Sequence, residues 1–150
     1  MKDKPATVVL DSNVLLKTVL VEAYSQEVMQ WLLGAGELIN CHAPSWIYLE
    51  CAHTLQKAGR RFPNLYAPDQ LGKDFYHLKS IDLELYAFEP YTDRALELAL
   101  QFSISVYDGI FLALAEYLHM PFLTDDRRMI ACLKDYHAVE LISVSEYFGE

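Results

Sequence analysis

Four acidic residues of this chain stand where carboxylates could hold a divalent cation. Asp11 and Asp126 come after predicted strands, and Asp108 opens a predicted helix. Glu50 lies in the middle of a predicted amphipathic helix, on its apolar side. In an open parallel sheet the ligand crevice lies outside the carboxyl ends of the strands. Carboxylates gathered there repel one another unless a divalent cation sits between them, so these residues indicate a metal-dependent enzyme that acts on a phosphate-containing substrate.

Glu50 is the carboxylate that is hardest to explain as an ordinary surface residue. The predicted helix 44–59 has an apolar stripe that includes Ile47, Cys51 and Leu55, and Glu50 falls on this stripe. Glutamate is almost never fully buried unless it is paired. A functional role therefore fits Glu50 better than the alternative, in which its side chain bends from the edge of the stripe to water.

Asp108 and Asp11 each have a purely structural explanation as well. An aspartate just ahead of an apolar helix is a favoured N-cap, and by spacing alone Asp108 is more readily a cap than a ligand. Asp11 could start a turn or cap the next helix. Its neighbours Ser12 and Asn13 add polar groups that could bind a metal-bound water or a phosphate oxygen. Capping and ligation do not exclude each other.

Strand-like and helix-like segments alternate along the whole chain, with no linker and no repeat between them. The apolar patterns predict strands at 7–11, 38–42, 83–88, 104–106, 121–124 and 139–143. They predict helices at 13–21, 24–34, 44–59, 69–79, 91–102, 107–118 and 126–134, with Pro44 in the first turn of the third helix and a turn at 60–68. Because strands alternate with helices, we predict βαβ units and an α/β fold with a mostly parallel sheet.

The composition is that of a compact α/β protein. The 150 residues, 53% of them hydrophobic, are enough for one domain, predicted to span 1–150, with a sizeable core. No segment reaches the roughly 18 uninterrupted apolar residues of a membrane-spanning helix, and no apolar signal segment precedes the first strand. Cys41, Cys51 and Cys132 lack zinc-site spacing and are predicted to be small buried hydrophobic residues. We therefore expect a cytoplasmic protein with no membrane partner.

The net charge of −9 argues against a general nucleic-acid-binding protein, because phosphate contacts need a basic surface. Bound divalent cations would reduce the negative excess at the substrate site itself. The basic residues near the acidic motifs are candidate phosphate contacts: Lys17, Lys57, Arg60, Arg61, Arg127 and Arg128. For Lys57, Arg60 and Arg61, a solvated position at a helix end is at least as good an explanation. The aromatic residues are assigned to the core or to partner contacts, and no base-stacking platform is predicted.

Four segments of the chain together resemble a known family. They are Val-Val-Leu-Asp-Ser-Asn-Val-Leu-Leu (8–16), Pro-Ser-Trp-Ile-Tyr-Leu-Glu (44–50), Tyr-Asp-Gly-Ile-Phe-Leu-Ala-Leu-Ala-Glu (107–116) and Phe-Leu-Thr-Asp-Asp-Arg-Arg-Met (122–129). Their sequence and order look like a PIN domain, and within that superfamily they are most similar to the VapC-type ribonuclease toxins. The similarity is collinear from about residue 7 to residue 144. The last two motifs are the more specific, whereas a strand that ends in Asp-Ser-Asn is a weak signal alone.

The resemblance implies a three-layer α/β/α domain and a metal-dependent endoribonuclease. Asp11, Glu50, Asp108 and Asp126 would bind one or two Mg²⁺ or Mn²⁺ ions, directly or through water. Such ions activate water, orient the scissile phosphate and stabilise charge on the leaving oxygen, so no protein nucleophile is needed. Further residues would contact substrate or support the site: Ser12, Asn13, Thr124 and Arg127. The implied substrate is RNA.

Two positions bear on how closely this chain follows the family. The last motif usually has one small residue between threonine and aspartate, so Asp126 aligns with the acidic position and Asp125 is an extra carboxylate. We expect Asp125 to face solvent or to cap the following helix rather than to add charge to the site. VapC-like proteins often have asparagine three residues after the glutamate, where this chain has His53. This difference bears on substrate handling more than on metal binding.

The same resemblance implies that the chain is the toxin of a toxin–antitoxin pair. An acidic site can be inhibited by an inserted basic side chain, and arginine suits this because its planar guanidinium bonds a carboxylate through two hydrogen bonds. We therefore expect a small cognate antitoxin that docks an amphipathic helix near 13–34 and 44–59 and extends an Arg or Lys towards Glu50 and Asp126. The oligomeric state, including a homodimer, stays open.

Two other functional classes remain open from the sequence. A catalytically silent binding module could keep this fold for contact with a protein partner, although the complete acidic set argues against it. An aspartate-based phosphatase or phosphotransferase would also place Asp11 at the end of the first strand. Such enzymes commonly have a second aspartate two residues later, where this chain has Asn13, and a lysine near the end of a later strand, which we do not find.

Overall fold

A five-stranded parallel sheet forms the centre of the protein. The computed structural model describes residues 4–34 and 40–149. The strands are β1 (Thr7–Leu10), β2 (Asn40–Pro44), β3 (Glu84–Tyr86), β4 (Phe122–Thr124) and β5 (Leu141–Ser143). Their order is β3-β2-β1-β4-β5, and every neighbouring pair is parallel. The predicted parallel sheet is therefore confirmed.

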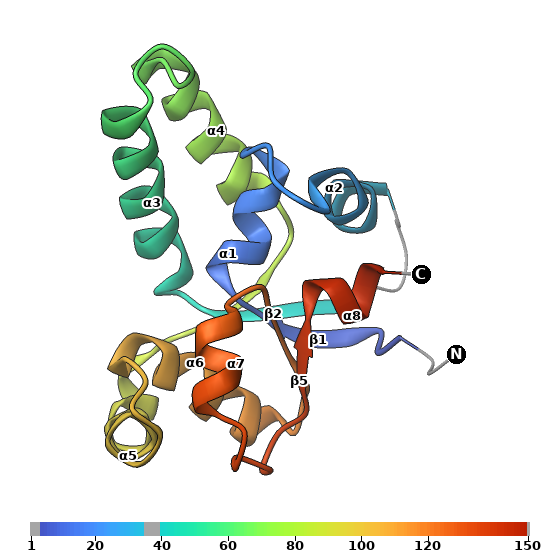
Figure 1. Ribbon diagram of the computed structural model, residues 1–150, viewed down its shortest axis with the longest axis vertical. Coiled ribbons are helices and arrows are strands. Elements are labelled where there is room, and N and C mark those ends of the chain that lie inside the picture. Colours follow the sequence, from blue (N-terminus) through green and yellow to red (C-terminus); the bar gives the residue numbers. More distant parts are fainter. Residues whose placement is uncertain (1–3, 35–39, 150) are drawn as a thin grey trace.

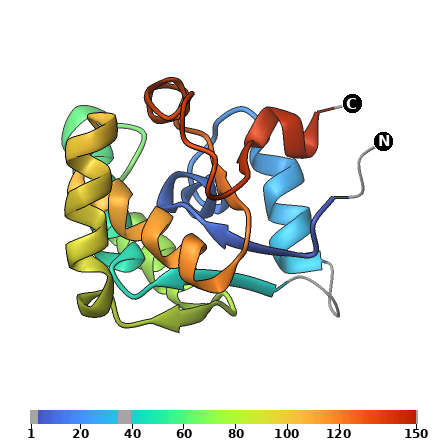
Figure 2. The same ribbon diagram turned by 90° about the horizontal axis from the view of Figure 1, so that it is seen from below.

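Helices cover both faces of the sheet, which confirms the predicted three-layer α/β/α architecture (Figures 1 and 2). The layer on one face contains α1 (Ser12–Leu15), the 3₁₀ turn η1 (Leu16–Thr18), α2 (Ser25–Gly34), α3 (Ile47–Arg61) and α4 (Pro68–Ser80). The layer on the other face contains η2 (Glu89–Tyr91), α5 (Thr92–Phe102), α6 (Val106–Leu118) and α7 (Arg127–Cys132). The last helix, α8 (Val144–Phe148), packs beside α2, where Trp31 contacts Tyr147 and Phe148 edge to face.

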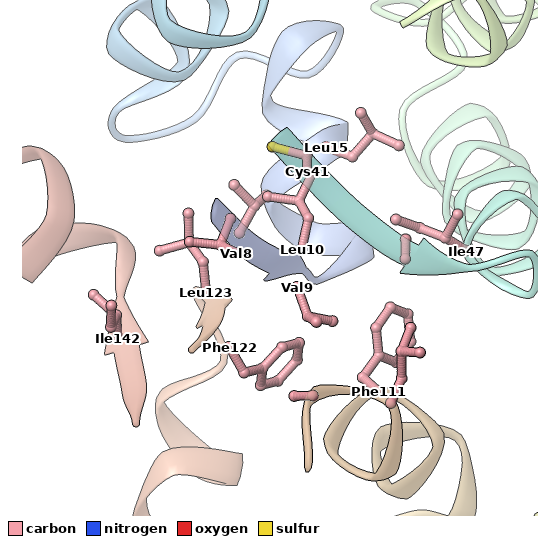
Figure 3. Packing of buried hydrophobic residues seen from close by; sticks show 14 of the residues in the cluster. Val8, Val9, Leu10, Leu15, Cys41, Ile47, Phe111, Phe122, Leu123 and Ile142 are labelled. Atoms are coloured by element: carbon pink, nitrogen blue, oxygen red, sulfur yellow. The ribbon is translucent and has the colours of Figure 1, made fainter. Parts of the chain in front are cut away.

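The two central strands are apolar on both faces because helices cover both faces. All three apolar residues of β1 at 8–10 are fully buried, as is the whole of β4. Side chains alternate across β1, so Val8 and Leu10 point to the α1 layer whereas Val9 points to the α6 layer (Figure 3). On the α6 side, the ring of Phe111 lies 5.8 Å from that of Phe122, centroid to centroid. This core holds β1 and β4, the two strands that precede Asp11 and Asp126.

Two predicted elements are wrong in ways that change the surroundings of the acidic residues. Pro44 is the last residue of β2 and pairs with Tyr86 of β3, so α3 begins only at Ile47 and not at Pro44. The predicted strand 104–106 is absent from the described chain, because Ser105 caps α6, which starts at Val106. A hydroxyl that accepts a backbone N–H stabilises a helix start, and this local interaction outweighs the short apolar pattern.

Smaller differences lie at the ends of elements. The predicted helix 13–21 ends at Thr18 as α1 and η1, and the predicted turn 60–68 is shortened because α3 reaches Arg61. Helix α8 was not predicted, although Ser143 and Glu146 form a capping box at its start. Residues 38 and 39 of the predicted strand 38–42 lie outside the described residues.

Within the described chain, no single helix has the length and apolar character needed to cross a membrane. One pair of helical segments, Glu89–Phe102 and Val106–Leu118, has that length and apolar character only when the two are counted together. The pair is bent by 115° at the break between them.

Gly109 sets the distance between α5 and α6, and we predict that Gly109→Ala destabilises the protein. A Cβ at this position would lie 2.5 Å from the backbone oxygen of Ala95, so α5 would have to move. The free energy of unfolding should fall by roughly 1–3 kcal/mol, as in other overpacked cores. Gly72→Ala in α4 is the control, because no atom lies within 4 Å of the new methyl group. It should raise stability by about 0.5–1 kcal/mol. Urea unfolding of both variants tests this, and equal stabilities would contradict it.

Candidate active site

The strand order contains one switch point, between β1 and β4, at which the connections from two neighbouring strands lead to opposite sides of the sheet. From β1 the chain passes to β2 on one side, whereas β4 and β5 lie on the other side. Ligands of open α/β sheets bind at such a switch point, outside the carboxyl ends of the strands. Asp11 directly follows β1, and Asp126 lies two residues after the end of β4. The backbone N–H of Asp11 donates to the Leu123 oxygen at 3.0 Å, which joins these two strand ends.

The other two carboxylates reach the same edge from helix starts. Helix α3 follows β2 and α6 precedes β4, so in a parallel sheet both helices begin at the carboxyl edge. Glu50 and Asp108 lie in the first turns of α3 and α6, respectively. The prediction that Glu50 lies in the middle of its helix is therefore wrong, because it assumed a start at Pro44. The later start places Glu50 at the sheet edge instead of along the helix.

Asp11 is a buried carboxylate held by hydrogen bonds from three neighbours. Its side chain is among the buried polar groups, with 4% exposure. One oxygen accepts from the backbone N–H of Ser12 at 2.7 Å, so Asp11 caps α1, one of the structural roles considered from the sequence. The other oxygen accepts from the Thr124 hydroxyl at 2.7 Å and from the Asn13 amide at 3.2 Å.

Thr124 connects Asp11 to Asp126. Its hydroxyl, which is fully buried, donates to Asp11 and accepts from the backbone N–H of Asp126 at 3.1 Å. Asp126 in turn caps α7, because its Oδ1 accepts from the backbone N–H of Met129 at 2.9 Å. Asn13 is hydrogen-bonded to the loop between β4 and α7, because its Oδ1 accepts from the backbone N–H of Asp125 at 3.0 Å. Asn13 and Thr124, predicted as supporting residues, therefore position the two aspartates.

Asp108 is not the N-cap that its spacing suggested. The cap of α6 is Ser105, whose hydroxyl accepts the backbone N–H of Asp108 at 3.0 Å. The Asp108 side chain is hydrogen-bonded to Ser105 in return, so it supports the helix start without being the cap residue. Burial raises the pKa of its carboxyl, hydrogen bonds with Ser105 lower it, and the negative charge of Asp126 raises it further.

Glu50 carries the least compensated carboxylate of the four. Its Oε1 is buried and has no hydrogen-bond partner among the described residues. Burial raises the pKa of Glu50 to about 8, and the charges of Asp11 and Asp108 add to the rise. The burial of Oε1 argues against the alternative from the sequence, in which the side chain bends to water.

The four carboxylates influence one another electrostatically. Burial raises the pKa of Asp11 to about 7 against the lowering effect of its hydrogen bonds to Thr124 and Ser12. The charges of Asp108 and Asp126 raise it further. Like charges that share a site disfavour ionisation, and an added cation reverses this effect. The donor set is therefore one that favours a hard divalent cation with oxygen ligands.

The spacing of these groups limits how such an ion would be held. No three His, Cys, Asp or Glu side chains among the described residues form a set that could hold a metal ion as placed. Mg²⁺ usually keeps several waters and binds through one or two carboxylates. The geometry therefore fits an ion bound by one or two of the four carboxylates, with the others acting through water, rather than a closed cage of protein ligands.

A cavity of about 200 Å³ opens beside Asp108 and Asp126. Its remaining lining residues come from the α5–α6 link and from α7: Ser103, Ile104, Ser105, Arg128, Met129 and Cys132. Arg128 is thus the basic residue that lines the space next to the carboxylates, whereas Arg127, which the resemblance implied as a substrate contact, does not line this cavity. Cys41 and Cys51 are buried as predicted, but Cys132 is half-buried and faces the cavity.

Lys17 is not available for a phosphate, which corrects its assignment as a candidate contact. Its side chain is 1% exposed, and its Nζ lies 2.8 Å from Asp125 Oδ2 and 3.2 Å from Glu22 Oε2. The Nζ also donates to the Ala23 oxygen at 2.9 Å. Asp125 therefore neither faces solvent freely nor caps a helix. It neutralises a buried ammonium and holds the loop before Asp126 against η1.

The remaining predicted residues lie at the margin of the site or away from it. Ser12 is buried against Asp11, and His53 is exposed on α3. Lys57, Arg60 and Arg61 occupy the far half of α3, roughly 10–16 Å along the helix axis from Glu50 at 1.5 Å per residue. The explanation of these three residues as a solvated helix end fits the structure better than a phosphate contact.

Comparisons with known proteins give a family and a fold. A family model described as PIN domain matches residues 8–132. A toxin–antitoxin complex from Klebsiella pneumoniae has a chain with 12% identity and a TM-score of 0.58, covering 88% of this chain and 94% of that chain. VapBC2 from Rickettsia felis, bound to a DNA fragment from their promoter, gives 15% identity and a TM-score of 0.62, covering 91% and 98%. At such identities the likeness shows the fold alone. No curated protein sequence matches the chain.

We predict that Asp125→Ala lowers the free energy of unfolding because it leaves the Lys17 ammonium buried with less compensation. The loss should be roughly 1–3 kcal/mol, below the 3–5 kcal/mol of a fully buried pair, since Asp125 is 35% exposed. The double variant Lys17→Met/Asp125→Ala should be more stable than the sum of the single effects implies. Urea unfolding of the four proteins measures this coupling, and strictly additive effects would show that the pair does not matter.

We predict that Glu50→Gln stabilises the metal-free protein at neutral pH. The folded protein holds the Glu50 proton up to about pH 8, whereas the ordinary pKa is 4.5. Stability of the wild type therefore falls as the pH rises through this window, and the amide removes the dependence. The gain at pH 7.5 should be on the order of 1 kcal/mol, or roughly 2–4 °C in Tm. Thermal unfolding at pH 5 and pH 7.5 in EDTA checks it. A gain that is larger at pH 5 would contradict the assigned cause.

Proposed function

The chain belongs to the PIN domain family, and from this premise we propose that it is a metal-dependent endoribonuclease and the toxin of a toxin–antitoxin pair. The observation that carries the proposal is the gathering of Asp11, Glu50, Asp108 and Asp126 at the switch point of the sheet. Burial raises the pKa of three of them, and their mutual repulsion adds to the rise. A cluster whose charges oppose one another is costly to the fold, and a bound cation would offset that cost.

Each residue has a distinct part in the proposed site. The four carboxylates would hold Mg²⁺ or Mn²⁺, directly or through water, and the bound ion supplies Lewis-acid activation for phosphodiester hydrolysis. Thr124 and Asn13 hold Asp11 in position through its Oδ2. Arg128 lines the cavity beside Asp108 and Asp126, and its guanidinium would bind a phosphate oxygen. No protein nucleophile is required.

The proposed substrate and the proposed partner are supported by different observations. RNA as substrate is supported by the resemblance of the four motifs to VapC-type ribonuclease toxins. A protein partner is supported by the two similar structures, one of which is a toxin–antitoxin complex and the other VapBC2. The net charge of −9 favours a basic inhibitor. Exposed apolar side chains on or beside α2 and α3 offer a docking surface for a partner helix: Val21, Met29, Leu33 and Leu49.

We predict that the amide variants of Asp11, Glu50, Asp108 and Asp126 lose RNA cleavage while keeping the fold. A loss of at least about 100-fold is expected, since each removes a charge from a site that acts through electrostatics. Asp125→Ala is the comparison: its carboxylate binds Lys17 and not the metal, so under conditions where it stays folded it should lose much less activity than Asp126→Asn. The assay follows cleavage of structured and unstructured RNAs with Mg²⁺, Mn²⁺ or EDTA. Full activity in EDTA, or in Glu50→Gln, would exclude the proposal, and no cleavage of any RNA would favour a silent binding module.

We predict that a small partner encoded beside this chain inhibits cleavage by placing an Arg or Lys among the carboxylates. Titration of the partner into the cleavage assay should abolish activity, and changing that basic residue to Ala should restore it. Association should slow as salt is raised, because surface charges steer the encounter. A partner that binds without inhibiting, or a protein that is harmless when expressed alone yet active in vitro, would leave a nuclease that is not a toxin.

A further inference from the structure

Two aromatic rings are stacked beside the acidic site. The rings of Trp46 and Tyr107 are parallel to within 6°, with their centroids 5.0 Å apart. This is an offset stack, in which each ring covers only part of the other. Phe88 packs its edge against Trp46 at 5.5 Å and 67°, so the indole is held from a second direction. The pair thus forms one packed aromatic surface.

Both residues lie within one helical turn of two of the four acidic residues. Tyr107 directly precedes Asp108 in the first turn of α6. Trp46 caps α3, and its carbonyl oxygen accepts the backbone N–H of Glu50 at 3.3 Å. A phosphate bound at the carboxylates would therefore have this aromatic pair within reach of the sugar and base that flank it.

Tyr107 is exposed although it belongs to a helix that is otherwise deeply buried. It is 54% exposed, whereas the seven residues at 109–115 are all buried. Tyr117, at the other end of the same helix, is also exposed, but it packs edge to face with Tyr91 and lies far from the acidic residues. Only Tyr107 of these two combines solvent access, a parallel ring partner and a neighbouring carboxylate.

The negative net charge limits the ionic contacts that this chain can make with RNA. Its net charge is −9, Lys17 is occupied by Asp125, and Arg128 is the basic side chain that lines the cavity beside the carboxylates. Protein side chains that could contact a phosphate are therefore few beside the carboxylates. The face of a nucleobase is uncharged, and stacking on an aromatic side chain is the usual way in which proteins bind unpaired bases. We propose that Tyr107, backed by Trp46, stacks on a base of single-stranded RNA next to the phosphate to be cut, an inference that rests on the proposed function.

A binding experiment that needs no cleavage tests this stack. Trp31→Phe leaves Trp46 as the only tryptophan, and Glu50→Gln prevents cleavage and removes one charge from the site. The emission of Trp46 is then followed while a six-nucleotide oligoadenylate, or an abasic strand with the same phosphates, is added. The base-containing strand should change the emission and bind more tightly. Tyr107→Ala should weaken its binding roughly 5- to 150-fold, the range for loss of one stacked base.

Three further variants separate stacking from other effects. Tyr107→Phe keeps the ring and should bind within about twofold of its parent, whereas Tyr107→Leu fills the space without a planar face and should bind as weakly as Tyr107→Ala. Tyr117→Ala removes a ring that is even more exposed, 68% against 54%, at the other end of the helix and should change nothing. Equal binding of the abasic strand, or equal effects of Tyr107→Ala and Tyr117→Ala, would overturn the inference. So would a Tyr107→Ala protein that binds RNA normally but loses the protein partner. Cleavage by the wild type is scored separately, so RNA binding that depends on Tyr107 without any cleavage would remove the hydrolase proposal and keep the stack.

Discussion

The hydrogen bond from the Thr124 hydroxyl to Asp11 is the interaction on which the rest of the site depends. It is 2.7 Å long and fully buried, and it joins the carboxyl ends of β1 and β4 through side chains. Because the same hydroxyl accepts the backbone N–H of Asp126, one group orients two like-charged carboxylates. Charge-assisted hydrogen bonds of this kind favour the ionised form of Asp11, whereas burial and neighbouring charges disfavour it. Burial is the larger effect, so the site is poised to gain from an added positive charge.

Two residues outside the site help to position the segments that carry its carboxylates. Lys17, buried under the loop that carries Asp125 and Asp126, holds that loop to η1 through an ion pair. Gly109 lets α6 approach the backbone of α5 closely and so sets the position of the helix start that carries Asp108. Neither residue reaches the cavity, yet both determine where carboxylates lie. A buried ion pair contributes little net stability, but breaking it is costly, and this suits a positional role.

The proposed function would require an acidic protein to bind RNA by a means that does not depend on positive charge. The stacked pair Trp46 and Tyr107 provides an uncharged surface beside Glu50 and Asp108. Its position follows from two helix starts that meet at one edge of the sheet. The same negative charge that makes phosphate binding weak favours a basic inhibitory partner. In the proposed function, the negative charge would therefore weaken substrate binding and strengthen binding of the inhibitor.

Local signals in the sequence determined the parallel α/β fold, and together with the family resemblance they indicated the four acidic residues as candidates. Apolar runs bounded by polar residues, such as 8–10 before Asp11, are short-range patterns that need no knowledge of neighbours. Tertiary structure decided what these patterns leave open. Pairing of Pro44 with β3 moved the start of α3 to Ile47 and so brought Glu50 to the sheet edge. The ion pair of Lys17 with Asp125 and the stack of Trp46 on Tyr107 each join residues far apart in the chain. Such contacts depend on how layers pack, and no periodicity within one segment contains that information.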